Sequence, residues 1–174
     1  MSEDYTKGYV SGFIDADGSF SVSIKVQRDV RYGVRIDPVF SVTQRNREVL
    51  EFLRRVLFLR RVLGCGRIIK KPGQENLWLY IVDRVEELNG KLLRFLEDGC
   101  RLIVKDKQLK LFTEIVKGLI EKRHYSYEGI KKLVHLSYEL SSLGGKAVRR
   151  RSLNEVLTII EGYEMRRRDA PGER

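Results

Sequence analysis

The stretch Val10-Ser-Gly-Phe-Ile-Asp-Ala-Asp-Gly18 decides the fold of this chain, because it marks where a helix ends and a strand begins. A short helix is predicted from Tyr5 to Ile14, since its apolar residues recur at helical spacing. Gly18 ends this segment, as a glycine commonly does just past a helix. The carboxylates Asp15 and Asp17 therefore lie at the C-terminal end of a helix, where the helix dipole favours a cation.

Two strands and a helix are predicted after this stretch. From Phe20 to Gln27 apolar and polar residues alternate, which predicts a strand with one buried and one exposed face. A second strand is predicted from Val34 to Gln44, in which Pro38 indicates an edge position or a bulge. A helix is then expected from Asn46 to Leu63, and within it a six-residue repeat, Phe52–Leu63, has no functional explanation.

The remaining elements complete an α+β pattern. Arg67 to Lys71 and Asn76 to Val82 are predicted to form a second hairpin. The order αββαββα, with additional C-terminal helices, predicts helices on one face of an antiparallel sheet. We expect one domain over residues 1–168 and a disordered tail over residues 169–174. The helices predicted after the second hairpin are Val85–Asp98, Lys107–Arg123, Tyr127–Leu143 and Leu153–Arg168, the last with a capping box from Ser152 to Glu155.

The composition favours a nucleic acid as partner. The 174 residues include 34 Lys and Arg against 24 Asp and Glu, and the formal net charge of +10 favours binding to a polyanion. No apolar stretch approaches the ~20 residues that span a bilayer, and the N-terminus has no secretory signal. Cys65 and Cys100, with His124 and His135, fit no zinc spacing. We expect an intracellular protein, in a prokaryotic cytoplasm or an organelle, with no membrane partner.

The segment Val10–Gly18 resembles the LAGLIDADG motif of homing endonucleases, including the whole Asp-Ala-Asp-Gly ending. The resemblance extends over roughly residues 5 to 125, because the order of the elements also agrees. It implies a site-specific, intron-encoded DNA endonuclease of the single-motif, homodimeric kind. Such an enzyme makes metal-dependent double-strand breaks with short 3′ overhangs at a long, near-palindromic site.

The resemblance also implies the residues of a catalytic site. In the family the second acidic residue of the motif is the metal ligand, so Asp17 is expected to bind Mg²⁺ together with the backbone carbonyl of Ala16. Mn²⁺ or Ca²⁺ could occupy the same site. Gln44, at the end of the second strand, and Lys105 match polar and basic residues that order water near the metal. Asp15 is expected to be structural.

One position departs from the family pattern. Glu48 stands where an arginine is often found, four residues after the strand-end glutamine. Arg45 or Arg47 could take its place, and the sequence does not decide between them.

Two other interpretations of the Asp-Ala-Asp-Gly segment are weaker. The segment could be an ordinary turn between a helix and a strand, because Asp and Gly are common there. It could also resemble a calcium-binding EF-hand loop. With Gly18 at the sixth place of such a loop, Phe13 and Ile24 fall at the first and twelfth places, where acidic ligands are needed. The EF-hand interpretation therefore fails.

A single motif supplies one carboxylate, so the chain is expected to form a homodimer. Gly8, Ser11 and Gly12 are small residues at neighbouring helical positions, which allows a second helix to approach closely. If two such helices cross at a two-fold axis, two Asp17 carboxylates converge, and like charges at that distance need divalent ions between them. A phosphodiester placed there would meet a two-metal site suited to in-line displacement by water.

The polar face of the strands is expected to read DNA in the major groove. In the second hairpin, Leu77, Leu79 and Ile81 are assigned to the core face. That assignment turns Trp78 and Tyr80 to the opposite face, where a partner helix or loop could also cover them. Arginines at 149–151 and 166–168 are phosphate contacts or solvated charge. The side chains predicted to contact DNA are Ser21, Ser23, Lys25, Gln27, Arg35, Asp37, Ser41, Arg67, Lys71, Trp78 and Tyr80.

Two rival functions use the same fold. An intron-encoded maturase would bind RNA and assist splicing, and a regulator would bind DNA without cleaving it. Both would tolerate loss of the metal ligand, so the intact Asp17 argues for cleavage.

Overall fold

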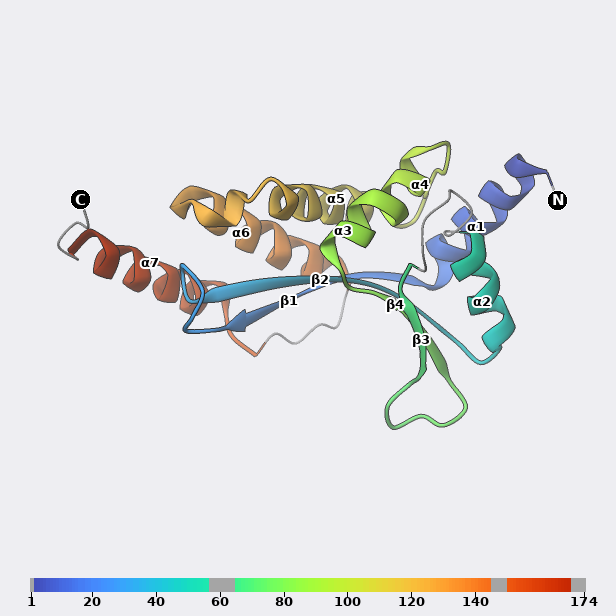
Figure 1. The fold of residues 1–174 in the computed structure, drawn as a ribbon, viewed down its shortest axis with the longest axis horizontal. Coiled ribbons are helices and arrows are strands. Elements are labelled where there is room, and N and C mark those ends of the chain that lie inside the picture. The colour runs from blue at the N-terminus through green and yellow to red at the C-terminus, as the bar shows by residue number, and fades with distance from the viewer. Residues whose placement is uncertain (1, 57–64, 145–149, 170–174) are drawn as a thin grey trace.

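The computed structural model describes residues 2–56, 65–144 and 150–169. Their order confirms the predicted αββαββα pattern with additional C-terminal helices (Figure 1). The elements are α1 (Glu3–Asp17), β1 (Gly18–Val26), β2 (Val34–Gln44), α2 (Arg47–Val56), β3 (Arg67–Lys70), β4 (Trp78–Val82), α3 (Val85–Glu87), a π-helical turn η1 (Leu88–Leu93), α4 (Arg94–Glu97), α5 (Asp106–Ile120), a 3-10 turn η2 (Arg123–Tyr125), α6 (Tyr127–Leu143) and α7 (Leu153–Asp169).

The four strands form one antiparallel sheet in the order β1-β2-β4-β3. β1 and β2 pair without interruption from Gly18 opposite Val42 to Val26 opposite Val34, so no bulge accompanies Pro38. β2 pairs with β4 only from Phe40 to Gln44. Pro38 therefore lies where β2 is paired on the β1 side alone, which explains how a central strand accommodates a proline.

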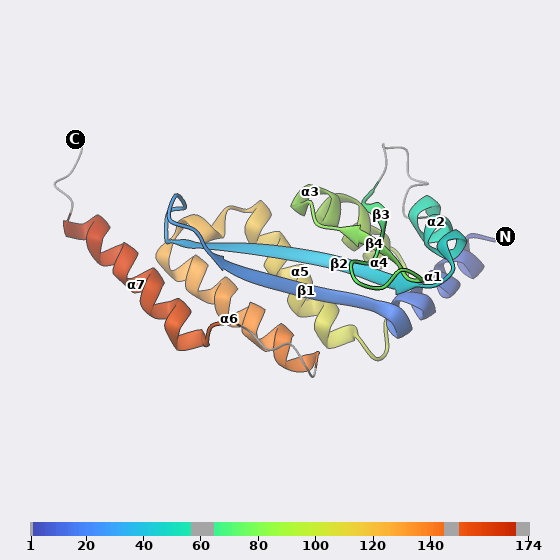
Figure 2. The same ribbon diagram turned by 90° about the horizontal axis from the view of Figure 1, so that it is seen from below.

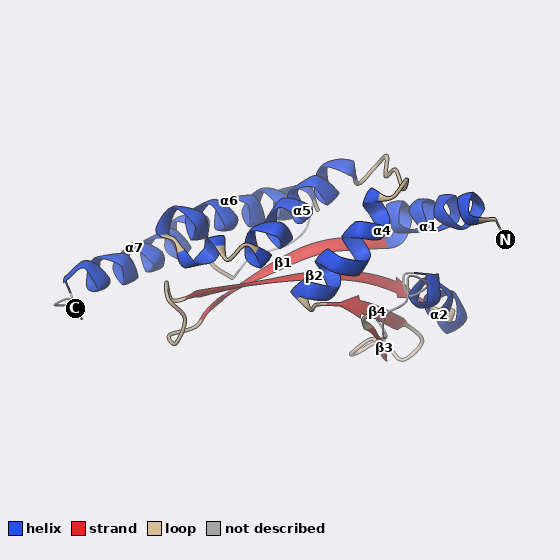
Figure 3. Cartoon of the chain, turned by 45° about the horizontal axis from the view of Figure 1, so that its top comes forward, coloured by secondary structure: helices blue, strands red, loops and turns tan. Residues whose placement is uncertain are grey.

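The helices cover one face of this sheet. Figures 1 and 3 show α3, α4, α5 and α6 on that face, while no helix of the described residues lies across the other. Figure 2 views the sheet from its uncovered side, with the long β1–β2 hairpin in front. We call this uncovered side the open face; on β1 and β2 it consists of Ser19, Ser21, Ser23, Lys25, Arg35, Asp37, Val39, Ser41 and Thr43.

Strict alternation along the first hairpin produces the two faces. Phe20, Val22, Val34, Ile36, Phe40 and Val42 are buried beneath the helices, whereas Ser19, Ser21, Ser23 and Lys25 are exposed. Phe112 of α5 packs against Phe20, with ring centroids 5.2 Å apart. The sheet thus has an apolar side for the core and a polar side that remains accessible, as antiparallel sheets commonly do.

Several predicted boundaries change. α1 begins at Glu3, because Ser2 accepts a hydrogen bond from the backbone of Tyr5, and it continues to Asp17 itself. α7 continues through Asp169, so the predicted tail begins too early, and residues 170–174 lie outside the described residues. The same holds for residues 57–64, which include the second copy of the repeat.

The capping box at the start of α7 is confirmed: the backbone amide of Ser152 donates to the carboxylate of Glu155, whose own amide donates to Ser152 Oγ. In the part of the chain that the structure describes, no helix is long and apolar enough to cross a membrane.

Candidate active site and nucleic-acid interface

Asp17 is exposed at the last position of α1, where the chain enters the sheet. Gln44 Nε2 donates a hydrogen bond of 2.7 Å to Asp17 Oδ2. The pairing of Gly18 with Val42 explains this contact, because it brings the C-terminal end of β2 beside the end of α1. The structure therefore places together two residues that lie 27 positions apart and that the resemblance to the family assigns to one site.

Asp15 connects α1 to the loop that precedes α5. Its carboxylate accepts hydrogen bonds from the backbone amides of Ile103 (2.9 Å), Val104 (3.0 Å) and Lys105 (2.8 Å). Burial tends to raise the pKa of Asp15, but these three hydrogen bonds and the charge of Lys105 outweigh it, so its pKa lies below the ordinary value. Asp15 thus holds the loop in place, which is the structural role expected of it.

Lys105 caps the end of α1 from this loop. Its ammonium group donates to the backbone carbonyls of Asp15 and Ala16, the latter at 2.7 Å. A cation at these carbonyls is favoured because the last carbonyls of a helix are unpaired and carry the negative end of its dipole. Burial lowers the pKa of Lys105, and the charges of Asp15 and Asp17 oppose that change. Lys105 therefore contacts the same Ala16 oxygen that the resemblance to the family assigns to the metal.

The oxygen donors at the end of α1 fit a hard divalent cation, because Mg²⁺ and Ca²⁺ prefer carboxylate and carbonyl oxygens. Within residues 2–56, 65–144 and 150–169, no group of three or more His, Cys, Asp and Glu side chains could hold a metal ion. One chain offers the Asp17 carboxylate and the Ala16 carbonyl. A second copy is needed to bring a second carboxylate.

The face of α1 that could meet a second copy is open. Gly8 and Gly12 are exposed, and a Cβ built on either would meet no atom within 4 Å. The assignment of Ser11 to this face is wrong. Ser11 is buried against its own chain and donates to the Lys7 carbonyl at 2.7 Å, because its position on the helix faces the core with Val10 and Ile14.

That Arg45 or Arg47 takes the role of the arginine replaced by Glu48 remains a prediction. Arg47 lies over the Trp78 ring at 4.8 Å and pairs with Glu51 at 2.8 Å. Since Trp78 pairs opposite Gln44, Arg47 is held near the end of β2.

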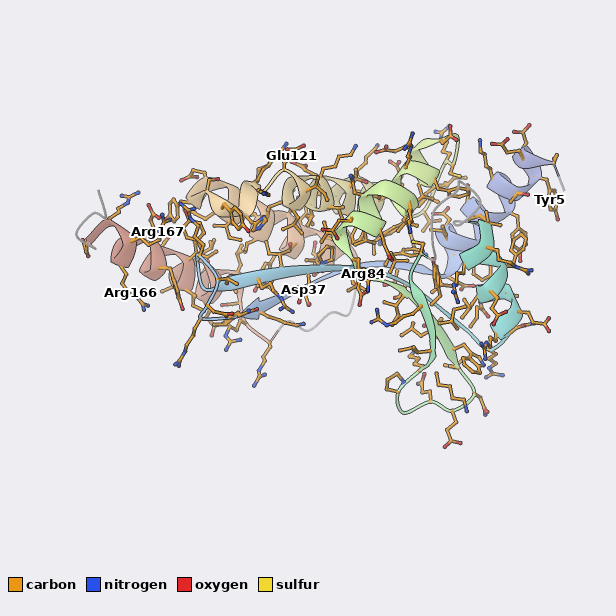
Figure 4. All side chains as sticks on the ribbon, in the orientation of Figure 1. Tyr5, Asp37, Arg84, Glu121, Arg166 and Arg167 are labelled. Carbon is orange, nitrogen blue, oxygen red and sulfur yellow. The ribbon has the colours of Figure 1, made fainter. Side chains whose placement is uncertain are left out.

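On the open face, Asp37 joins two of the predicted DNA-contacting cations, Lys25 and Arg35, in ion pairs of 2.8 Å. Figure 4 shows Asp37 on the side of β2 away from α5. Ser21 Oγ donates to the Val39 carbonyl at 3.2 Å, and Gln27, just past β1, donates to Asp29 at 3.1 Å. The predicted residues Ser21, Ser23, Lys25, Arg35, Asp37 and Ser41 share this face.

In the second hairpin, the face of β4 that points to the core is the opposite of the predicted one. Tyr80 is fully buried and donates a hydrogen bond of 3.0 Å to the Cys65 carbonyl, and it pairs opposite the core residue Val42. Trp78, on the same face of β4, is half-buried under Arg47 and Lys70. The assignment of Tyr80 to the DNA-contacting face is therefore wrong, and Trp78 belongs to the same side as Tyr80.

The sequence analysis did not predict which residues of β4 lie on the open face in place of Trp78 and Tyr80. Leu79 and Ile81 pair opposite Thr43 and Ser41, so their side chains share the open face with Arg67. Asp83, also missed, holds Arg67 through two hydrogen bonds of 2.8 and 2.7 Å. No periodic signal could have found this arrangement, because β4 is apolar at every position.

Comparison with known proteins agrees with this geometry. The model of the LAGLIDADG endonuclease family matches residues 10–116. The homing endonuclease I-ApeII of Aeropyrum pernix is 47% identical over 162 residues, which are 92% of this chain and 93% of that protein. The archaeal intron-encoded homing endonuclease I-Vdi141I, solved in complex with DNA, is 48% identical with a TM-score of 0.86, over 94% of this chain and 99% of that one. At 19% identity, I-CvuI shares the fold with a TM-score of 0.73, over 92% and 96% of the two chains. This chain belongs to the LAGLIDADG family of homing endonucleases.

Proposed function

We propose that this protein is a site-specific, divalent-metal-dependent DNA endonuclease that acts as a homodimer. It makes double-strand breaks with short 3′ overhangs at a long, near-palindromic site. The observation that carries the proposal is the exposed Asp17, hydrogen-bonded to Gln44 at the end of α1 and adjacent to the open face. The DNA complex described for I-Vdi141I, 48% identical to this chain, supports DNA as the substrate.

The dimer follows from the number of carboxylates and the shape of α1. One chain contributes one Asp17, and the exposed surface at Gly8 and Gly12 allows a second α1 to approach closely. Two copies related by a two-fold axis would present two Asp17 side chains and two open faces. Because the faces are identical, the preferred target repeats its sequence in inverted order about the centre.

The length of the target follows from the length of the strands. β1 has nine residues, which extend over about 30 Å. Since base pairs in a duplex are about 3.4 Å apart, one open face can follow about nine base pairs. Two faces then cover about eighteen base pairs, which makes the target long enough to be rare.

The chemistry of the site depends on groups that this chain positions. Gln44 orients the Asp17 carboxylate, and Lys105 brings a positive charge to the carbonyls at the end of α1. Asp17 and the Ala16 carbonyl would hold Mg²⁺, with Mn²⁺ or Ca²⁺ accepted by the same oxygens. When bound, such an ion lowers the pKa of a water molecule and neutralises charge on the phosphate. The similarly folded I-CvuI, 19% identical to this chain, is described with uncleaved DNA in the presence of magnesium and with its own target in the presence of calcium, so this fold binds DNA in solutions of either ion.

The proposal is tested by cleavage of a library of random DNA duplexes in Mg²⁺, followed by sequencing of the ends. We expect inverted repeats around the cut and short 3′ overhangs. Asp17→Asn should abolish cleavage and leave binding to the selected duplex largely intact, because it removes the ligand charge without changing the open face. Glu114→Gln, which removes a carboxylate paired with Lys132 between α5 and α6, should leave cleavage unchanged. Comparable cleavage by Asp17→Asn would contradict the assignment.

The same experiment separates the rival functions. A non-cleaving regulator would bind DNA without releasing ends from any duplex, and an RNA maturase would prefer its intron RNA to every duplex. Exposure of Asp17 at the surface where DNA would lie favours the endonuclease.

A further inference from the structure

Two like charges face each other on the open face, near the turn of the β1–β2 hairpin. Lys25 on β1 pairs directly opposite Arg35 on β2, and like charges in that relation destabilise a sheet. Asp37, two residues beyond Arg35 on the same face, contacts both. Its Oδ1 accepts from Arg35 Nε at 2.8 Å, and its Oδ2 accepts from Arg35 Nη2 at 2.9 Å and lies 2.8 Å from Lys25 Nζ.

The carboxylate lies beneath the two cations. The side chain of Asp37 is 26% exposed, against 48% for Arg35 and 57% for Lys25. Burial tends to raise the pKa of Asp37, but the hydrogen bonds from Arg35 and Lys25 outweigh it and its pKa lies below the ordinary value. An approaching duplex therefore contacts the two cations first. The ionised carboxylate of Asp37 lies beneath them and holds both in place.

These contacts leave one edge of the Arg35 guanidinium available. The group has five N–H donors, and Asp37 takes one on Nε and one on Nη2. The remaining donors are two on Nη1 and one on Nη2, at the end of the side chain away from Asp37. A parallel pair from these two nitrogens matches O6 and N7 of guanine in the major groove.

We propose that Asp37 is a positioning residue for base recognition, and that Arg35, held by Asp37, reads one guanine in each half-site. The inference rests on the proposed function, because it requires the open face to lie in a major groove. Asp37 acts in two ways. It fixes the direction of the guanidinium, and it reduces the charge of the Lys25–Arg35–Asp37 cluster from +2 to +1, which weakens attraction to phosphates of any sequence.

The test measures binding and cleavage of every single-base variant of the duplex selected with the wild-type protein. Asp37→Asn keeps the size of the side chain and removes its charge. We expect the preference for guanine at one base pair in each half-site to fall at least about fivefold, the lower range for a bidentate base contact. Affinity for unrelated duplexes should rise, and it should depend more steeply on salt. Asp37→Glu, which restores the charge, should recover part of the preference.

Two further variants make the result specific. Arg35→Ala should remove the preference at the same base pair that Asp37→Asn affects. Glu114→Gln removes a carboxylate paired with Lys132 at 2.6 Å between α5 and α6, and it should leave the whole profile unchanged.

Three outcomes would overturn the inference. Asp37→Asn could leave the profile unchanged while Arg35→Ala alters it, which would make Asp37 dispensable. It could weaken all base pairs equally, which would indicate a merely structural role. It could abolish a preference for cytosine that Arg35→Ala retains, which would mean that Asp37 contacts a base itself. Failure of the proposed function is distinguishable, because the wild-type protein would then select no cleaved duplex.

Discussion

The two ends of the β1–β2 hairpin are stabilised by different kinds of contact. Its inner end, formed by Asp15–Gly18, Gln44 and Lys105, is held by hydrogen bonds to the Asp15 and Asp17 carboxylates and to a carbonyl at the end of α1. Its outer end, the turn at residues 27–33, is closed by aromatic rings. Tyr32 is 3% exposed and donates to the Tyr125 carbonyl.

α7 completes the outer end. Arg167 Nη1 donates to the Tyr32 hydroxyl at 3.2 Å, and its guanidinium lies 5.6 Å from the centre of that ring. Gly33 has a φ of 69°, and a Cβ added there would lie 2.3 Å from the Tyr163 ring, so only glycine permits this packing. The outer end is therefore sealed and stabilises the hairpin, whereas the inner end exposes its charges to a substrate.

The largest effect is expected from a bulky side chain on α1 that prevents a second copy of the chain from approaching. Gly12→Leu adds a bulky side chain to the exposed face of α1, where nothing in the same chain lies within 4 Å of a Cβ. The chain should fold but remain monomeric, and cleavage should be lost. Sedimentation and cleavage of the selected duplex measure both effects. Gly90→Leu, at another helical glycine with open space, is the matched control. A dimeric, active Gly12→Leu protein would show that the interface lies elsewhere.

A second change loosens the inner end without touching Asp17. Asp15→Asn removes the charge that holds the amides of residues 103–105, so Lys105 should lose its position. We expect cleavage to fall about 10- to 100-fold, as for other groups that orient a metal site. Unfolding free energy should fall by about 1–3 kcal/mol, because hydrogen bonds to a charged group are lost. Unchanged cleavage would mean that the loop holds Lys105 without Asp15.

A third change opens the outer end. Arg167→Ala removes the hydrogen bond to Tyr32, so unfolding free energy should fall by about 1 kcal/mol while base preference is unchanged. Figure 4 shows Arg166 and Arg167 leaving α7 on different sides. Arg166 lies over the Tyr163 ring at 4.8 Å, so Arg166→Ala should not affect the Tyr32 contact. Denaturant titration of the two variants separates their roles, and equal losses of stability would contradict the distinction.

The smallest effect is a difference in acid sensitivity between the two ends. The pKa of His124, at the outer end, is lowered from 6.5, mainly by burial and also by the charge of Lys122. The unfolded chain therefore takes up this proton first, and stability present above pH 6.5 should fall as the pH drops through the lowered pKa. The contribution of Asp15, whose pKa is lowered from 3.8, should be lost only below that value.

Amide hydrogen exchange between pH 7 and pH 5 measures this difference, with loss of protection expected first around residues 30–33 and 123–127. His124→Gln should remove the change. Earlier loss of protection at the inner end would contradict the assignment.

Sequence reasoning was accurate where one side of an element is polar and the other apolar. β1 alternates serine with large apolar residues, so its two faces were predicted correctly. β4 reads Trp-Leu-Tyr-Ile-Val, and a period of two cannot choose a face when both are apolar. Pairing with β2 made the choice, because Tyr80 opposite Val42 and Val82 opposite Phe40 both add to the core.

By itself the sequence determined the order of the elements, the stop of α1 before Gly18 and the polar face of the first hairpin, because these depend on local spacing and on helix and strand periods. Only the tertiary structure decided which partners the charged groups found. Asp15 meets amides 88 to 90 positions away, and Tyr32 meets Arg167 across 135 positions. The physical reason is that a side chain's partners depend on how distant elements pack, which no local pattern records.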